Sequence, residues 1–568
     1  MVAFSKPKRK FRNNLVRRGF KMNIHIPHLR VVVSASGAGF VVMRAWLPST
    51  LDRFVNFAQT RKVWVPLCVL FLVGYLMLLI CSTTYVGYLD HIEPNIASVS
   101  FVLLNGEPLY HDLASAPRYS MMYGPMAYLP YTLALRLIGA NILSLKLVVL
   151  LANLCLLGIL WYCYRKVLDP PAALLVMVVV ISFLLFSNDY VLQVRGDILI
   201  NLFVALGLLA VVVAPPWMSA PLLALACGFS FDVKVSGPIY FLPLYVLFIR
   251  RHGLRSAAWA AIGAAVIATV PFLFPQISVS GYLRWLHRAS QLPHSRREIV
   301  AELEVLLVVC ASVVLLLWQL AQRNRTLLTT YLKNNRIFLV VLIGSVAAVA
   351  IPASVIGAGP HHFIPFYSTV GYVCADIYQK TKHAMVEKPL PGRMGFVHLL
   401  WFWLALVVAT RLGTSTTARI LLTSRSQATA VVGDLEMVMR NHPGQRIEMG
   451  YGKVRTWGDP RYQLTYFRPV VVFAGNPLTI DAVALDYMQL SGLDIPSSTL
   501  EYLQACKTRI WLIPKGEPPF AVVNFFSLVD IHLVPKFPLF SDQFRQIFFQ
   551  RYRKQGSSKY FDIWECPG

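Results

Sequence analysis

Residues 63–83 read VWVPLCVLFLVGYLMLLICST, and residues 85–94 read YVGYLDHIEP. The first stretch holds 21 residues and no charge, and a helix of that length spans about 30 Å, the thickness of a bilayer's hydrocarbon core. The second stretch places Asp90, His91 and Glu93 within four positions. The sequence therefore predicts a membrane-spanning helix followed at once by titratable side chains at the lipid–water boundary.

The rest of the chain repeats the first of these patterns. Of its 568 residues, 56% are hydrophobic and 14% are charged, whereas soluble chains average about 45–50% and about 25%. The apolar residues fall in blocks long enough to cross a bilayer as helix. The predicted spans are residues 63–83, 142–163, 172–187, 197–214, 218–235, 238–250, 256–275, 301–321, 336–356, 362–378 and 396–412. The expected fold class is a polytopic α-helical membrane protein with about eleven transmembrane helices.

The formal net charge is +26, and the Lys and Arg residues between the apolar blocks predict the orientation. Cytoplasmic loops of membrane proteins are enriched in these residues. Residues 1–62 hold 13 Lys or Arg against one acid, Asp52, which predicts a basic cytoplasmic tail. We favour this topological role, with attraction to membrane lipids, over specific binding of anionic headgroups or of nucleic acid.

The same rule predicts that the longest and most polar loops lie on the outer side of the cytoplasmic (inner) membrane. The predicted outer loops are residues 84–141, 187–197, 276–300 and 357–362. Within the first of them, residues 123–139 are apolar, but Pro125 and Pro130 interrupt them. Counting them as a span would place the basic loops outside, so they are predicted to form an interfacial helix. Pro94 predicts a turn at Glu93.

From about residue 413 the pattern changes, and no further span follows. Helix-like stretches at 428–441 and 497–506 alternate with runs typical of buried strands, VVVFAG (470–475) and RIWLIP (509–514). We therefore expect a transmembrane catalytic domain at residues 63–412 and an extracytoplasmic α/β domain at residues 413–568. Cys506 and Cys566 lie in that polar region and could pair in an oxidising compartment.

The order of motifs in the first half of the chain carries a family resemblance. Asp90 follows the first span, NGEPLY follows at residues 105–110, and YGP at residues 123–125 opens an apolar helix. This order resembles the GT-C superfamily of integral-membrane glycosyltransferases, and within it the bacterial branch of the lipid A aminoarabinose transferase and the Rgt-like enzymes, over residues 60–412.

The resemblance implies a GT-C-like fold and a reaction. Such enzymes move a sugar from a polyprenyl-phosphate carrier to a lipid or glycan acceptor on the extracytoplasmic side. An acidic residue of the first outer loop is the catalytic base, and Asp90 matches that position best, with Glu93 second. A partly buried carboxylate is suited to take the proton of an attacking hydroxyl. Direct displacement from the phosphate-linked donor would invert the anomeric centre.

A lipid phosphate leaving group needs cations where its negative charge develops. Arg195 and Asp197 resemble the family's R-x-D opening of a span, although a snorkelling Arg with a capping Asp gives the same pattern. Lys234, followed by Gly237, also resembles the family. The candidate substrate-binding residues are His91, Tyr123, Arg195, Asp197, Lys234, Arg284, Arg288, His361 and His362.

Several of these candidates have a second interpretation. Arg284 and Arg288 belong to a basic, aromatic stretch of the third outer loop, predicted to be an amphipathic surface helix, which either anchors at the membrane surface or binds the carrier phosphate as a mobile lid. Tyr123 either stacks on a sugar or anchors at the interface. His361 and His362 are adjacent, which favours contact with phosphate or sugar over a zinc site. The sequence indicates no cofactor and no metal ligand set, and it leaves the use of a divalent metal open.

Two other classes of function remain as alternatives. A transporter or flippase for lipid-linked glycans would share the helices, but transporters place polar groups near the bilayer midplane, and here most charges lie at the outer rim. A scaffolding protein would need no titratable groups crowded into the first outer loop. No GxGxxG or P-loop pattern is present, which agrees with a lipid-linked donor rather than a nucleotide.

Overall fold

The computed structural model describes residues 23–26, 29–32, 61–187, 190–387, 420–421, 423–453, 459–524 and 537–567. The chain divides into two units, Met1–Phe54 and Val55–Gly568. In the first unit, β1 (Asn23–Ile26) and β2 (Leu29–Val32) form an antiparallel pair. Of the predicted tail, residues 1–62, only these two strands and residues 61–62 are described; the rest lies outside the described residues. The second unit contains all other described elements.

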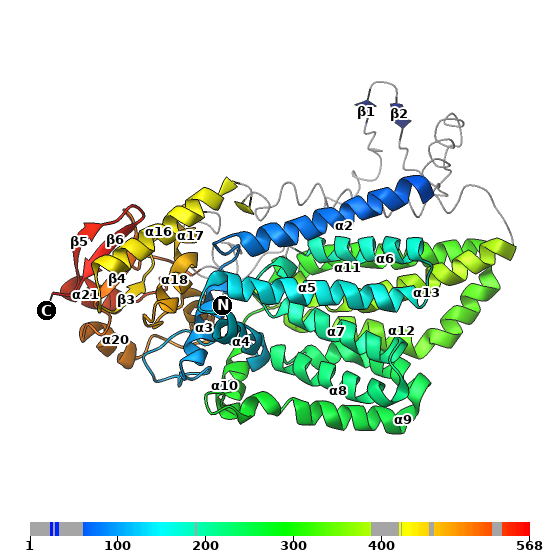
Figure 1. Cartoon of the computed structure of the whole chain (residues 1–568), viewed down its shortest axis with the longest axis horizontal. Coiled ribbons are helices and arrows are strands. Elements are labelled where there is room, and N and C mark those ends of the chain that lie inside the picture. The colour runs from blue at the N-terminus through cyan, green and yellow to red at the C-terminus, as the bar shows by residue number, and fades with distance from the viewer. Residues whose placement is uncertain are drawn as a thin grey trace, which may run out of the picture. The chain divides into compact units, whose positions relative to one another are not determined.

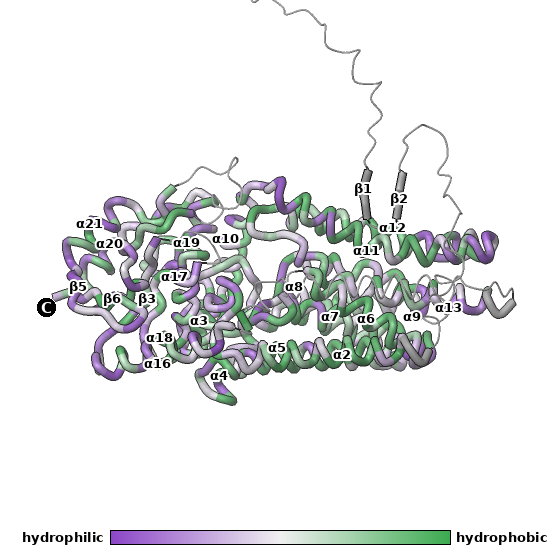
Figure 2. Tube along the Cα trace, turned by 90° about the horizontal axis from the view of Figure 1, so that it is seen from above, coloured by the Kyte–Doolittle hydropathy of each residue, from purple (hydrophilic) through white to green (hydrophobic). Residues whose placement is uncertain are grey.

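Long helices form the larger part of the second unit. They are α2 (Arg61–Thr84), α5 (Ile142–Arg165), α6 (Pro170–Phe186), α7 (Asp197–Val212), α8 (Pro216–Val233), α9 (Leu242–Ile267), α11 (Arg296–Arg323), α12 (Arg325–Ala353) and α13 (Phe366–Glu387). They run side by side (Figure 1), and most of their residues are hydrophobic (Figure 2). The chain is accordingly an integral membrane protein.

Among the described residues, five helical segments are long and apolar enough to cross a membrane. They are Trp64–Thr84, Ile142–Arg165, Gly237–Leu273, Arg296–Arg323 and Arg336–Ala353. The helices α6 and α7 are apolar but shorter. The predicted number of about eleven spans is not confirmed, and the predicted span 396–412 lies outside the described residues.

The apolar segment Gly237–Leu273 is two helices rather than one. Gly253 has φ 81° and ψ 165°, which breaks the helical path inside α9. Just before the break, Arg251 donates a hydrogen bond to the Val211 carbonyl at the C-terminal end of α7. Beyond it, Ala264 and Ile267 approach Gly228, near the C-terminal end of α8. The chain therefore turns back at the Gly253 break, as the two predicted spans 238–250 and 256–275 required.

The first outer loop contains more helix than the sequence predicted. It forms α3 (Ile92–Leu104), η1 (Pro125–Ala127) and α4 (Leu129–Ile138). The predicted turn at Glu93 is wrong, because α3 begins there and Pro94 sits in its first turn, where a missing N–H costs nothing. The ten residues of α4 span about 15 Å, half a hydrocarbon core, as expected for the interfacial helix predicted at 123–139.

Short elements connect or extend these helices. They are η2 (Tyr190–Leu192), η3 (Gly237–Phe241), η4 (Val270–Leu273), α10 (Val279–Ala289) and η5 (Pro360–Phe363). The helix α10 is the amphipathic helix predicted for the third outer loop. Its Tyr282 and Trp285 are buried, with Tyr282 against Tyr110 and Trp285 against His111. These aromatic rings therefore dock α10 on the first outer loop and are not available as membrane anchors.

The C-terminal region is a mixture of helices and a small sheet. Its elements are α16 (Arg425–Asn441), β3 (Ile447–Met449), α17 (Pro460–Gln463), η6 (Leu464–Phe467), α18 (Arg468–Phe473), α19 (Ala482–Leu490), α20 (Ser497–Gln504), β4 (Ile510–Pro514), α21 (Asp542–Arg551), β5 (Arg553–Ser557) and β6 (Phe561–Glu565). The strands form one sheet in the order β3-β4-β6-β5, with only the β3–β4 pair parallel.

Three of the four patterns expected in this region are confirmed, and one is wrong. The predicted strand at 470–475 is the helix α18, because a short apolar run does not distinguish a buried strand from a buried helix. Pro469 stands in its first turn and Gly475, at φ 86°, follows its end. The predicted pairing of Cys506 with Cys566 is confirmed by a disulfide between them.

Candidate functional site

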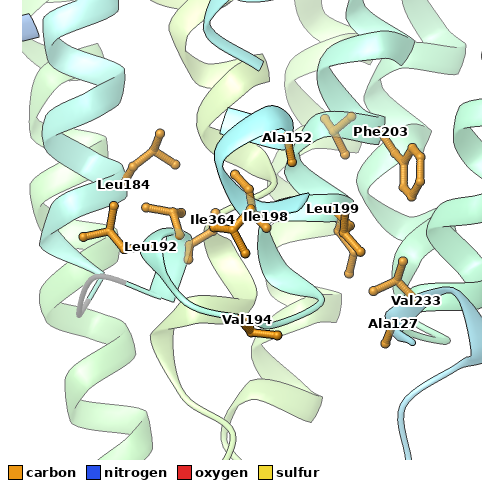
Figure 3. Close-up of a cluster of buried hydrophobic side chains, with 14 of the residues drawn as sticks. Ala127, Ala152, Leu184, Leu192, Val194, Ile198, Leu199, Phe203, Val233 and Ile364 are labelled. Carbon is orange, nitrogen blue, oxygen red and sulfur yellow. The ribbon is translucent and has the colours of Figure 1, made fainter. Parts of the chain in front are cut away.

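Buried apolar residues next to the candidate side chains bring the outer loops together. Val194, Ile198, Val233 and Ile364 belong to one hydrophobic cluster and are fully buried, and Figure 3 shows all four in it. Val194 and Ile198 flank Arg195 and Asp197, Val233 precedes Lys234, and Ile364 follows His361 and His362. The packing of these four apolar residues therefore brings polar side chains from three separate segments close together.

Gly196 and Gly124 allow the backbones at this place to approach closely. A Cβ at Gly196 would lie 2.6 Å from Val233 Cγ1, and one at Gly124 would lie 2.1 Å from the Asp232 carbonyl oxygen. Both distances are far inside van der Waals contact, so larger residues would push the segments apart. The glycines of VRGD and YGP are thus explained by the assembly of the site.

Four side chains form what we call the charged cluster: Asp90, Arg195, Asp197 and Lys234. Arg195 Nε lies 3.0 Å from Asp197 Oδ2, and Lys234 Nζ lies 2.6 Å from Asp197 Oδ1. A second nitrogen of Arg195, Nη1, pairs with Asp90 Oδ2. All four side chains are between 3% and 12% exposed. Asp197 therefore holds both cations in position, and Arg195 bridges the two carboxylates.

Asp90 is ionised in this arrangement. Its other oxygen, Oδ1, pairs with His91 Nδ1 and accepts the backbone N–H of His91 at 2.6 Å. Burial opposes the ionisation of Asp90, but the charges of His91 and Arg195 and the hydrogen bonds from His91 outweigh it and hold the pKa of this carboxyl well below its usual range. While Arg195 stays paired with it, Asp90 is a weak base.

Glu93, the second predicted catalytic residue, is fully enclosed. Its Oε2 accepts the backbone N–H groups of Leu89 and Asp90, and its Oε1 accepts that of Val194 at 2.7 Å. No part of it is exposed. Burial raises its pKa, while Lys146 and the amides of Val194 and Leu89 oppose that shift. Because both oxygens are occupied, Glu93 fastens the first outer loop to the second and cannot reach an acceptor.

His361 and His362 lie beside the charged cluster, as predicted. The ring of His361 contacts those of Tyr190 and His362, with both centroid distances 4.8 Å and the ring planes tilted by 60° and 53°. Burial lowers the pKa of His361 well below its ordinary value, although the charge of Asp197 opposes the shift. In the absence of an anionic ligand, His361 is therefore neutral. The carbonyl of His362 accepts a hydrogen bond from Tyr240 at 2.8 Å.

Two aromatic residues complete the surroundings of the cations. The ring of Tyr123 lies 5.9 Å from Lys234 Nζ, so this predicted residue is at the site. Tyr190 was not among the predicted residues, and its ring lies 4.3 Å from the Arg195 guanidinium carbon. Its place five residues before Arg195 in the same outer loop was the available signal. Aromatic faces in contact with cations hold them by their negative quadrupole.

Arg284 and Arg288 are not brought to the charged cluster. Arg284 pairs at 2.8 Å with Asp112, and the two side chains are 43% and 62% exposed. Arg288 donates to Gln291 on its own exposed surface. Their positions follow from the docking of α10 through Tyr282 and Trp285, which leaves both arginines outside the charged cluster.

Two buried charges near the site lay outside the predicted set of residues. Lys146 of α5 donates to the carbonyls of Ser82 at 2.9 Å and Tyr85 at 2.7 Å, so it caps the C-terminal end of α2. Asp232 does not pair with Lys234. It is fully buried, and neither of its oxygens has a hydrogen-bond partner among the described residues.

Three tyrosines of the C-terminal region lie within electrostatic reach of the charged cluster. Burial, and in smaller part the charge of Asp90, raises the pKa of Tyr462 and Tyr466 well above the usual range, and Tyr487 also lies within electrostatic reach of Asp90 and Arg195. No local pattern distinguished these tyrosines in the sequence. They reach the site because the first outer loop is bound to the C-terminal region.

Backbone and side-chain hydrogen bonds make that attachment. Arg118 donates its N–H to the Thr479 carbonyl at 2.6 Å and accepts from the Asp481 N–H at 3.0 Å. Ser498 and Thr499 donate to the carbonyls of Ala114 and Ala116. Residues 114–118 of the first outer loop therefore form an attachment surface for the C-terminal region. Among the described residues, no three His, Cys, Asp or Glu side chains are placed to hold a metal ion.

Comparisons with known proteins give one line of similarity. No family model and no curated protein matches the chain. Among solved structures, the chain is similar to ArnT from Cupriavidus metallidurans, in crystal structures of the undecaprenyl phosphate complex and of the apo state. Each has 14% sequence identity and a TM-score of 0.49, and the alignment covers 87% of this chain and 97% of that chain. This similarity concerns the fold alone, and the functional proposals depend on the residues of this chain.

Proposed function

We propose that the protein is a membrane glycosyltransferase that moves a sugar from a polyprenyl-phosphate carrier to a lipid or glycan acceptor on the extracytoplasmic side. Asp90 is the general base, and Arg195 and Lys234 bind the carrier phosphate. The single observation that supports this most is the contact of the ionised Asp90 with the buried Arg195, which shares Asp197 with the buried Lys234, at the ends of apolar helices.

In this proposal Arg195 pairs with Asp90 before the carrier binds and with the carrier phosphate afterwards. The two carboxylates and two cations of the charged cluster balance each other, so an arriving phosphate competes with Asp90 and Asp197 for Arg195 and Lys234. Asp197 binds both cations and keeps them in place, whereas Asp90 is the most exposed of the four at 12%. Arg195 therefore turns from Asp90 to the phosphate.

Loss of Arg195 changes the basicity of Asp90. Without that cation, the burial of Asp90 is less well compensated and its pKa rises, which makes it a better base. It then takes the proton from the acceptor hydroxyl as the oxygen attacks the anomeric carbon, and the bond from that carbon to the phosphate oxygen breaks. Arg195 and Lys234 stabilise the charge that develops on the leaving phosphate, and the anomeric configuration inverts.

Glu93 and His91 act by position in this scheme. Glu93 fixes the backbone of residues 89 and 90 against Val194, which sets the distance between Asp90 and Arg195. His91 contacts the carboxylate directly and holds its orientation.

The test is sugar transfer in proteoliposomes that contain a radiolabelled polyprenyl-phosphate sugar and an extract of membrane lipids as acceptor. Asp90→Asn should lower the rate by about 10²- to 10⁴-fold, the usual contribution of a general base. Glu107→Gln is the matched control, because Glu107 is an exposed carboxylate in the same loop. Transfer by Asp90→Asn at the wild-type rate would rule out Asp90 as the base.

A further inference from the structure

A groove separate from the charged cluster lies where the membrane helices meet the C-terminal region. Its volume is about 620 Å³, within the range of ligand-binding pockets. It is lined by the C-terminal end of α2, the N-terminal end of α5 and one side each of α16 and α18, including Thr84, Leu143, Val432, Val470 and Phe473. The lining is mainly apolar.

The groove stands at the level of the lipid–water boundary. The helices α2 and α5 are both long and apolar enough to cross a membrane, and α2 ends at Thr84 while α5 begins at Ile142. These two ends line the groove. In a bilayer that α2 and α5 span, this level corresponds to the glycerol and upper hydrocarbon regions of the lipids.

The groove continues an apolar surface that faces away from the protein. On α5, Leu143, Leu151 and Leu154 are 48%, 60% and 44% exposed, and their spacing of eight and eleven places them on one face of the helix. On the adjoining α4, Leu137 is 73% exposed. An exposed apolar stripe of this kind marks a membrane contact. Leu143 belongs both to this surface and to the lining of the groove, so a hydrocarbon chain can pass from the bilayer into the groove along α5.

Most side-chain polar groups at the rim of the groove are already hydrogen-bonded within the protein. The hydroxyls of Thr83 and Thr84 donate back to the carbonyls of Leu79 and Ile80, so they are already used inside α2. Asn141 accepts the Ser144 N–H as the cap of α5. These three side chains therefore have little hydrogen-bonding capacity left for a ligand in the groove.

Among the described residues, Glu436 is the only charged one that lines the groove itself, and it is exposed. Arg425 stands next to the groove and donates to the carbonyl of the lining residue Thr84 at 3.3 Å. An exposed carboxylate repels an anionic headgroup and attracts an ammonium group. The charge at the rim is thus complementary to a phospholipid whose outermost group is cationic.

We propose that this groove binds one hydrocarbon chain of a zwitterionic phospholipid from the surrounding bilayer, with the ammonium group of the headgroup beside Glu436. The bound lipid fills the space between α2, α5, α16 and α18 and so joins the membrane helices to the C-terminal region. This proposal is independent of the glycosyltransferase reaction.

The test uses a phosphatidylethanolamine that carries a photoreactive diazirine in one acyl chain, in phosphatidylcholine vesicles with the full-length protein. Labelling should concentrate on residues 140–143, 432–439 and 470–474. Ala140→Trp and Ala474→Trp fill the groove from two exposed positions and should each reduce labelling there at least fivefold. Leu151→Trp, on the same apolar surface but outside the groove, should leave it unchanged.

The preference for a cationic group in the headgroup is tested in a separate experiment. The wild type should label at least threefold more with the phosphatidylethanolamine probe than with a phosphatidylglycerol probe, and Glu436→Gln should abolish that preference. Two results would overturn the proposal: labelling of the groove that neither tryptophan variant reduces, or displacement of the probe by an equimolar amount of unlabelled polyprenyl phosphate, which would make the groove part of the carrier site.

Discussion

Replacement of Glu93 by glutamine separates the two carboxylates of the first outer loop. Three backbone N–H groups, those of Leu89, Asp90 and Val194, converge on the two oxygens of Glu93. Glutamine has one oxygen, so its NH₂ group must face at least one of these donors. An unsatisfied buried donor costs about 1–3 kcal/mol, and hydrogen bonds to a charged group lose further strength when the charge is removed.

The neighbouring Lys146 adds to this cost. It is 2% exposed, and the charge of Glu93 is the one that favours its charged form. Together these effects predict a loss of about 3 kcal/mol or more in the free energy of unfolding of Glu93→Gln. Asp90→Asn should cost less, because Arg195 retains Asp197 as a partner at 3.0 Å.

The assay is thermal unfolding in lipid nanodiscs together with sugar transfer. Glu93→Gln should lower the apparent melting temperature by several degrees and keep measurable turnover in its folded fraction. Asp90→Asn should do the reverse, with a nearly unchanged melting temperature and turnover reduced by at least 100-fold, in keeping with loss of a base. If Glu93→Gln melts like the wild type and loses turnover as Asp90→Asn does, Glu93 is the reacting carboxylate and the assigned roles are wrong.

Three further predictions follow from other parts of the structure. Burial lowers the pKa of His111 from 6.5 to about 4, so the folded state binds fewer protons than the unfolded state between these values. The free energy of unfolding should therefore fall by about 3 kcal/mol as the pH drops from 6.5 to 4, and His111→Phe should remove this dependence in melting curves recorded across that range. Asp197→Asn leaves Lys234 buried without its partner and should destabilise by about 3–5 kcal/mol; Lys234→Met in the same chain should recover at least 1 kcal/mol of this, and strictly additive melting shifts would contradict the pairing. Cys506 and Cys566 are 60 positions apart, so reduction of their disulfide should lower the free energy of unfolding by up to about 4 kcal/mol. A membrane-impermeant thiol reagent should label both cysteines from the outside only after reduction.

The membrane helices were predictable because their signal is local. A run of about 20 apolar residues is decisive without any knowledge of its neighbours, so residues 63–83 and 142–163 correspond closely to α2 and α5. The reversal at Gly253 was also predictable, because Arg250, Arg251 and Arg255 stand between two apolar runs. The strand expected at 470–475 failed because a short apolar run has no period that separates strand from helix.

Residues of the charged cluster were predictable one by one, but their arrangement was not. Arg195, Asp197 and Lys234 stand out as charges at the ends of apolar runs. The sequence did not reveal that Arg195 would pair with Asp90, 105 positions away, because that contact depends on the packing of Val194, Val233 and Ile364. Arg284 and Arg288 have the same local appearance, and only the docking of α10 separates them from the site.

The different roles of Asp90 and Glu93 likewise depend on long-range contacts. Both are acids in one short segment, and the sequence ranked them only by resemblance. The amide of Val194, from the second outer loop, closes the environment of Glu93, whereas Asp90 faces the cations. The tyrosines of the C-terminal region reach the site through hydrogen bonds that join it to the first outer loop, which no local pattern encodes.

The most direct test of the charge exchange at Arg195 is the affinity of purified Asp90→Asn for polyprenyl phosphate, measured by titration calorimetry in detergent beside wild type and Glu107→Gln. The exchange requires that Arg195 leave Asp90 when the phosphate binds, so Asp90→Asn should bind the carrier several-fold more tightly than wild type while its sugar transfer is lost. Weaker binding by Asp90→Asn than by wild type would contradict the exchange and, with it, the assignment of Arg195 to the carrier phosphate.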